Sequence, residues 1–141
     1  MKLEKSIHIN CTPEKAFAFV ADFANAKQWM VGYIDSKVLT EGETRVGTQY
    51  VVVSKLLGQK MEMKSEITVW DPPHCYEYKT LGSPAVTSRV TCAPADGGTL
   101  VTFLADGEFS GLFKLAEGLM KGQMDKTMDE ALNALKKALE G

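Results

Sequence analysis

The sequence contains little of what metal sites and disulfide frameworks are built from. Among 141 residues there are only two histidines and three cysteines, and no CxxC or HxxxH spacing occurs. A zinc site is therefore not expected, and we predict neither a metal nor another cofactor. The three cysteines, Cys11, Cys75 and Cys92, are odd in number and far apart in the sequence. This favours reduced thiols that act as small apolar side chains.

A strong net charge and a long apolar run are also missing. Sixteen Lys and Arg are scattered among eighteen Asp and Glu, which gives a net charge of −2. No basic surface for a nucleic acid partner is expected from this balance. No apolar run approaches the roughly 18 residues of a membrane span, and residues 1–5 do not resemble a signal peptide, so we expect a cytoplasmic protein. The length predicts one domain over residues 1–141. Monomer and homodimer both stay open.

Strand-like segments fill the middle of the chain. Residues 2–10 alternate between apolar and polar side chains and predict a first strand. Gly or Pro with a polar neighbour then separates six further segments, as hairpin loops require. These predicted strands span residues 33–40, 46–57, 61–70, 75–81, 86–93 and 99–109. The pattern predicts an antiparallel meander.

Helical patterns lie at the two ends of this meander. Thr12 and Pro13 suit the cap and first position of a short helix, and a second helical turn is expected at 25–28. Residues 111–139 carry one apolar stripe at helical spacing. About 29 residues at ~1.5 Å each make a helix of roughly 43 Å, longer than most of the strands. The sheet must curve around such a helix, which leaves room for a cavity between them.

Two glycines interrupt the first half of the predicted long helix. Gly118 and Gly122 each cost ~1 kcal/mol relative to alanine. One interpretation is a flexible or kinked segment over a ligand portal. The other, which we favour, is close approach of the helix to the sheet or simple tolerance.

Strand parity and helical spacing predict which side chains face the cavity. In 61–70 they place the methionines inward and Trp70 outward, and they place Arg89 outward in the strand 86–93. Gln123 is the best single polar candidate for orienting a ligand, although local hydrogen bonding within the core is the favoured interpretation of such polar residues. The predicted ligand-binding residues are Trp29, Met61, Met63, Ser65, Ile67, Tyr78, Ser88, Val101, Phe103, Leu119, Met120, Gln123, Met124 and Thr127. No catalytic residue is predicted, because this set contains no His, Asp, Glu, Lys or Arg.

Short motifs along nearly the whole chain resemble a known superfamily. They are Ser6-Ile7-His8-Ile9, Thr12-Pro13-Glu14-Lys15-Ala16-Phe17, Trp29, Gly47-Thr48, Val69-Trp70-Asp71-Pro72-Pro73, Gly98-Thr99 and Ala131-Leu132-Asn133-Ala134-Leu135-Lys136. In this order the chain resembles the START-like (SRPBCC) superfamily, and within it the polyketide cyclase/dehydrase and lipid transport family. The resemblance implies an α+β helix-grip fold, as in the birch pollen allergen. In that fold a seven-stranded curved antiparallel sheet surrounds a long C-terminal helix, and two short helices lie between the first two strands.

The resemblance also implies an interior pocket for a hydrophobic ligand, with Trp29 at the rim of its opening. It implies no single activity. We favour binding or transport of a small hydrophobic molecule, such as a lipid, isoprenoid or polyketide-like compound. One alternative is a polyketide cyclase or dehydratase, which requires an acid or base of suitable pKa in the pocket. The other is a protein-interaction module, which requires a large exposed apolar patch.

Overall fold

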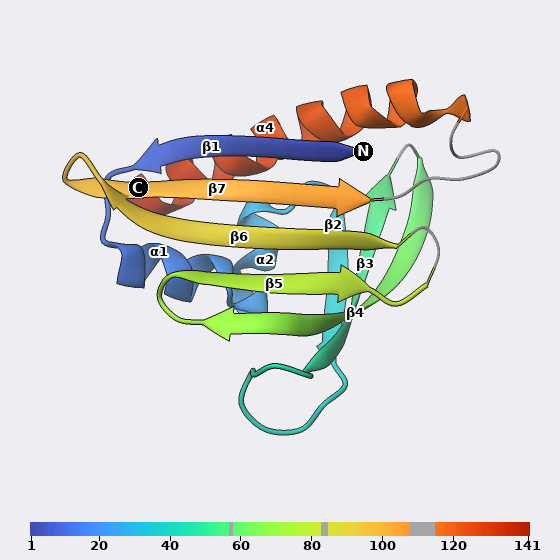
Figure 1. Cartoon of the computed structure of the whole chain (residues 1–141), viewed down its shortest axis with the longest axis horizontal. Helices are drawn as coiled ribbons and strands as arrows, with labels where there is room; N and C mark the ends of the chain where they lie inside the picture. The colour runs from blue at the N-terminus through green and yellow to red at the C-terminus, as the bar shows by residue number, and fades with distance from the viewer. Residues whose placement is uncertain (57, 83–84, 108–114) are drawn as a thin grey trace.

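A curved antiparallel sheet of seven strands dominates the structure (Figure 1). The computed structural model describes residues 1–56, 58–82, 85–107 and 115–141. The strands are β1 (Lys2–Ile9), β2 (Tyr33–Val38), β3 (Gln49–Leu56), β4 (Gln59–Asp71), β5 (Cys75–Thr80), β6 (Val86–Ala95) and β7 (Gly98–Gly107). Their order in the sheet is β1-β7-β6-β5-β4-β3-β2. Each pair of neighbouring strands except β1–β7 is also consecutive in the sequence. The predicted meander is therefore confirmed.

The helices gather on one side of this sheet. Between β1 and β2 lie α1 (Pro13–Val20), the 3-10 turn η1 (Phe23–Asn25) and α2 (Ala26–Trp29), and the long helix α4 is Glu117–Glu140. In Figure 1 the C-terminal half of α4 passes behind β1 and β7, and it contacts α1 and α2 there. Thr12 caps α1 by accepting a hydrogen bond from the Lys15 backbone N–H at 3.2 Å. The predicted helix-grip class is confirmed.

Several predicted strand ends shift by one to three residues, and the largest shift is at the start of β3. The strand expected to begin at residue 46 begins at Gln49, because Gly47 adopts φ 93° and the chain turns there. The Thr48 hydroxyl closes this turn by accepting a hydrogen bond from the Arg45 backbone N–H at 2.9 Å. The long helix was expected from residue 111. Residues 108–114 lie outside the described chain, and α4 begins at Glu117.

A β-bulge in β4 reverses the parity of the end of the strand. Ile67 pairs with Tyr78, but Val69 pairs with Glu77, so Thr68 is the extra residue. Beyond a bulge the side chains alternate in the opposite sense. Trp70 therefore joins the concave face, where its ring lies 5.3 Å from that of Phe17, and the prediction that Trp70 points outward is wrong.

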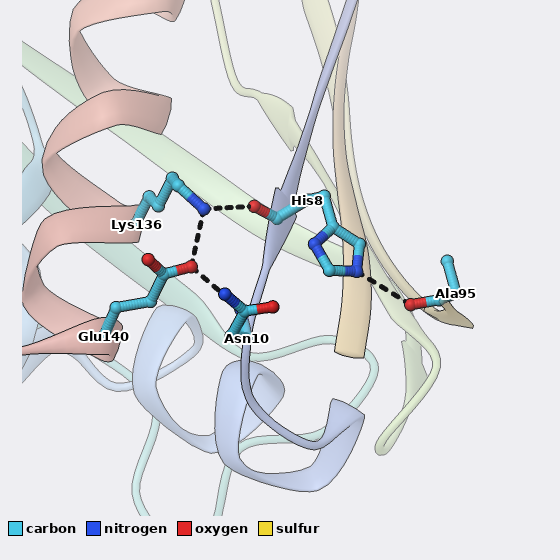
Figure 2. Close-up of polar contacts among 5 residues, drawn as sticks. All are labelled: His8, Asn10, Ala95, Lys136 and Glu140. Carbon is cyan, nitrogen blue, oxygen red and sulfur yellow. Dashed lines mark hydrogen bonds and ion pairs between the residues drawn. The ribbon is translucent and has the colours of Figure 1, made fainter. Parts of the chain in front are cut away.

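The C-terminal half of α4 is fixed firmly to the sheet. Ala131, Leu132, Leu135 and Leu139 are buried beneath it. Figure 2 shows the polar contacts at the same end: Lys136 Nζ donates to the His8 carbonyl at 2.8 Å, and Glu140 accepts from the Asn10 backbone N–H at 2.9 Å. Apolar burial and these hydrogen bonds together join the last turns of the helix to β1.

The N-terminal half of α4 is attached differently. Between residues 115 and 130 no side chain is buried, and Leu115 and Leu119 are 86% and 78% exposed. Lys5 of the edge strand β1 reaches this half with ion pairs of 3.0 Å to Asp125 and to Asp129. The apolar stripe was expected to be buried along its whole length, and for Leu115 and Leu119 this is wrong. These two residues project into solvent, whereas the buried stripe starts at residue 131.

The two helix glycines lie in this exposed half. A Cβ placed on Gly118 or Gly122 would meet no atom within 4 Å in the part of the chain that the structure describes. Close approach to the sheet therefore does not explain either glycine.

Candidate ligand-binding cavity

A cavity of about 310 Å³ lies between the concave face of the sheet and the helices. Strands β3 to β7 supply one wall, and Thr127, Met128 and Ala131 of α4 lie opposite. The segment from α1 to β2 covers a further side with nine residues. These are Val20, Ala21, Asp22, Phe23, Ala26, Trp29, Met30, Val31 and Tyr33. The two short helices therefore form part of the cavity wall.

Aromatic rings dominate the lining. All four tyrosines, both tryptophans and two phenylalanines contribute: Phe23, Trp29, Tyr33, Tyr50, Trp70, Tyr76, Tyr78 and Phe103. The rings contact one another, with centroid distances of 4.7 Å for Phe23–Tyr50, 6.0 Å for Tyr50–Tyr78 and 5.5 Å for Trp29–Phe103. Tilted and edge-on pairs of this kind are favourable beyond the area they bury. The rings thus hold each other in a fixed wall.

Two cross-strand pairs of hydroxyl groups interrupt this apolar wall. Tyr50 of β3 lies directly opposite Ser65 of β4, and Tyr78 of β5 lies opposite Ser88 of β6. Burial raises the pKa of Tyr50 and Tyr78, and a hydrogen bond from the facing serine opposes each rise only in part. Both phenols therefore stay protonated and neutral near pH 7.

The third inward tyrosine of this face is already engaged. The Tyr76 hydroxyl donates to the Val20 carbonyl at 3.3 Å, which joins β5 to the end of α1. Burial also raises the pKa of Tyr76. The Tyr76 hydroxyl therefore already donates its proton to a hydrogen bond within the protein.

Charged groups are scarce around the cavity. Asp22 and Arg89 are the charged residues among the described lining. The Asp22 carboxylate accepts from the Ala24 backbone N–H at 2.9 Å and caps η1. Arg89 forms an ion pair of 3.4 Å with Glu77, its partner across β5 and β6, and its side chain is 43% exposed. Within the described residues no group of three His, Cys, Asp or Glu is arranged to hold a metal ion.

Eight of the predicted ligand-binding residues line the cavity. They come from α2, four strands and α4, and they are Trp29, Met63, Ser65, Ile67, Tyr78, Ser88, Phe103 and Thr127. Trp29 was expected at the rim, but it is only 8% exposed and packs on Phe103. The structure brings these eight residues together, and their binding role stays a prediction.

The other six predicted residues do not line the cavity. Met61 lies near the β3–β4 hairpin and is 41% exposed, whereas Val101 is fully buried elsewhere in the core. Four belong to the half of α4 that buries no side chain: Leu119, Met120, Gln123 and Met124. Gln123 bonds locally, since its Nε2 donates to the Thr127 hydroxyl at 3.5 Å. Helical spacing identified the apolar stripe correctly but not the point along it where contact with the sheet begins.

Sequence reasoning missed several lining residues. Trp70 was hidden by the bulge at Thr68, for which the sequence contains no clear signal. Phe23, Met30 and Val31 lie between α1 and β2, where a run of apolar residues exceeds what two short helices need for packing on the sheet. This surplus of apolar residues could have indicated that the segment lines the cavity. Tyr50, whose parity the valine run at 51–53 concealed, is 4% exposed and faces inward.

None of the described helices is both long enough and apolar enough to cross a membrane. A search of curated protein sequences gave no match. Among solved structures, a protein of Thermus thermophilus superimposes with a TM-score of 0.83 at 17% identity, covering 99% of this chain and 97% of that one. A START superfamily protein from Mycobacterium smegmatis gives 0.81 at 15% identity, with coverages of 99% and 97%.

A structure with a named activity also shares the fold. The ZhuI aromatase/cyclase from Streptomyces sp. R1128 superimposes with a TM-score of 0.79 at 14% identity, covering 99% of this chain and 93% of that one. Identities this low establish the fold alone. A family model described as polyketide cyclase/dehydrase and lipid transport matches residues 1–140. With the helix-grip fold and its cavity, this match shows that the chain belongs to the polyketide cyclase/dehydrase and lipid transport family.

Proposed function

We propose that the protein binds a small hydrophobic molecule in the cavity and acts as a carrier or receptor for it. The observation that carries this proposal is the cavity of about 310 Å³ with its aromatic wall. At ~24 cal/mol per Å³, a closed, dry void of this volume would cost on the order of 7 kcal/mol of packing energy, which is an upper limit for a cavity that opens to solvent. Even a part of this cost is large against the stability of a typical domain, about 5–15 kcal/mol. A ligand that fills the cavity restores packing contacts along its walls.

A cyclase or dehydratase is less well supported. The aromatase/cyclase among the structural neighbours makes that reaction a natural alternative. Such chemistry needs a side chain that moves a proton at the reacting carbon. Asp22 is the single carboxylate in the described lining, and it already caps η1. Burial raises the pKa of Tyr50 and Tyr78, so both phenols stay protonated near pH 7 and neither can accept a proton there.

Native mass spectrometry before and after organic extraction tests the proposal on the purified protein. A non-covalent apolar adduct that extraction removes is the expected result. A fluorescence titration with the neutral probe N-phenyl-1-naphthylamine complements it, because this probe brightens when it leaves water. No adduct and no saturable rise in fluorescence would contradict the proposal.

A matched pair of substitutions locates the binding in the cavity. Met128 lines the cavity, whereas Met124, one turn earlier on α4, does not, and both are half-buried. We expect Met128→Trp to weaken probe binding at least tenfold, since the indole occupies cavity volume. Met124→Trp is the control and should change the affinity less than twofold. Far-UV circular dichroism confirms that both variants fold, and equal effects of the two substitutions would place the probe elsewhere.

A further inference from the structure

The charge distribution around the cavity restricts the kind of ligand it accepts. Arg89 is the single cationic residue of the described lining, and its guanidinium is directed to Glu77 at 3.4 Å. Arg89 touches the cavity, but by strand alternation its side chain and that of Glu77 lie on the opposite face from those of Ser88 and Tyr78. The one carboxylate of the lining, Asp22, repels an anion. A ligand carboxylate would therefore lose its hydration without gaining a counter-charge, which is costly in an apolar site.

One hydroxyl pair remains accessible from the cavity. Tyr78 and Ser88 both line it and are only partly buried, whereas Ser65 and Tyr50 are each 4% exposed. Tyr78 and Ser88 face each other across β5 and β6, and the Ser88 hydroxyl opposes the rise in the pKa of Tyr78. Two hydroxyls contain two O–H donors, and a hydrogen bond between them uses at most one of these donors. In the described residues neither hydroxyl has another hydrogen-bond partner, so one donor is left for a ligand.

We infer that Tyr78 and Ser88 form a polar subsite that binds an uncharged oxygen of the ligand, a ketone, ester or hydroxyl, and that the cavity discriminates against carboxylates. This inference rests on the proposed function and specifies its ligand class. The apolar remainder of the ligand lies against the aromatic wall. There the Tyr50 ring meets that of Tyr78 edge-on at a centroid distance of 6.0 Å, and the Tyr76 ring stacks on it at 6.1 Å. The ligand class is thus a neutral, largely apolar compound with at least one hydrogen-bond acceptor.

Three probes of one ring system test the charge preference. Naphthalene, 2-acetylnaphthalene and 2-naphthoate share the same rings and differ in carrying no oxygen, a neutral ketone or an anion. Isothermal titration at about pH 7.5, where the naphthoate is ionised, gives the three dissociation constants. We expect the ketone to bind more tightly than naphthalene by about two- to tenfold, the range of one hydrogen bond. The carboxylate should bind at least tenfold more weakly than the ketone.

Substitutions test the residues of the subsite. The double substitution Tyr78→Phe with Ser88→Ala removes both O–H donors and should reduce the affinity for 2-acetylnaphthalene to that for naphthalene. Naphthalene itself should bind the double variant and the parent alike. Ser6→Ala is the matched control, because Ser6 forms a similar cross-strand hydroxyl pair with Thr102, 2.8 Å apart, away from the cavity. It should leave all three affinities unchanged.

Each contrary result has a separate meaning. Naphthoate binding as tightly as the ketone would overturn the discrimination against carboxylates. A ketone affinity that survives both substitutions would overturn the assignment of Tyr78 and Ser88. If naphthalene, the ketone and N-phenyl-1-naphthylamine all fail to bind, the proposed function itself fails, and the subsite is overturned with it.

Discussion

The two halves of α4 differ strongly in burial. The same substitution should therefore lower the unfolding free energy much more in the C-terminal half than in the N-terminal half. Leu135 is fully buried, whereas Leu119 is 78% exposed. Leu135→Ala removes a side chain from the core beneath the helix, and such changes cost about 2–5 kcal/mol of unfolding free energy. Leu119→Ala removes contacts mainly with water and should change the stability by less than about 0.5 kcal/mol. The helix-propensity term is the same at both positions and cancels in the comparison.

Urea unfolding followed by far-UV circular dichroism measures this difference. Both variants should unfold in one transition with the m-value of the parent, so the midpoints convert directly into free energies. We expect Leu135→Ala to be less stable than Leu119→Ala by about 2–4 kcal/mol. Two variants within about 0.5 kcal/mol of each other would refute the reasoning. In that case the N-terminal half of α4 buries its apolar stripe in solution as the C-terminal half does.

Three further changes test other parts of the structure. Gly118→Ala with Gly122→Ala should raise the unfolding free energy by up to about 2 kcal/mol in urea, since both new methyl groups enter open space; a loss of stability would indicate hidden contacts. Hydrogen bonds from Lys136 and the Asn10 backbone lower the pKa of Glu140, so its stabilisation is present above its ordinary pKa and lost as the pH falls. Urea midpoints of Glu140→Gln should therefore fall less than those of the parent between about pH 6 and pH 3, and an equal fall would contradict this. Burial raises the pKa of the Cys92 thiol to about 12, so iodoacetamide at about pH 8 should label it only after unfolding, as peptide mass spectrometry can show.

The fold could be predicted because its signals are local and repeated. Each hairpin is marked by Gly or Pro, as at Asp96-Gly97, where both residues adopt positive φ and the chain turns between β6 and β7. Alternation between these turns identifies the strands, and antiparallel neighbours in sequence pair in space. The pairing of β1 with β7 joins residues about a hundred positions apart, so no local signal predicts it. Only the resemblance to the family implied a sheet that includes both strands.

The site was predicted only in part because it depends on where elements lie relative to one another. Parity placed Met63, Ser65 and Ile67 correctly, since no irregularity precedes them in β4. One extra residue, Thr68, then reversed the parity and concealed Trp70. For α4 the periodicity shows which side of the helix is apolar. It does not show which part of the helix lies on the sheet, because that depends on how the helix packs in the folded protein. The assignments of Leu119 and Met124 to the cavity failed for that reason.

Aromatic rings rather than methionines give the lining its character. Met63 of β4 and Met128 of α4 reach the cavity, whereas Met61, Met120 and Met124 do not. Methionine adapts to varied shapes, but an aromatic ring has few rotamers and is held by its ring neighbours. A wall made of contacting rings keeps its shape without a ligand and loses little conformational entropy when one binds. Under the proposed function, such a cavity selects its ligand by fit to rigid surfaces and by the few polar groups among them, and this is why we assign the polar subsite to the Tyr78 and Ser88 hydroxyls.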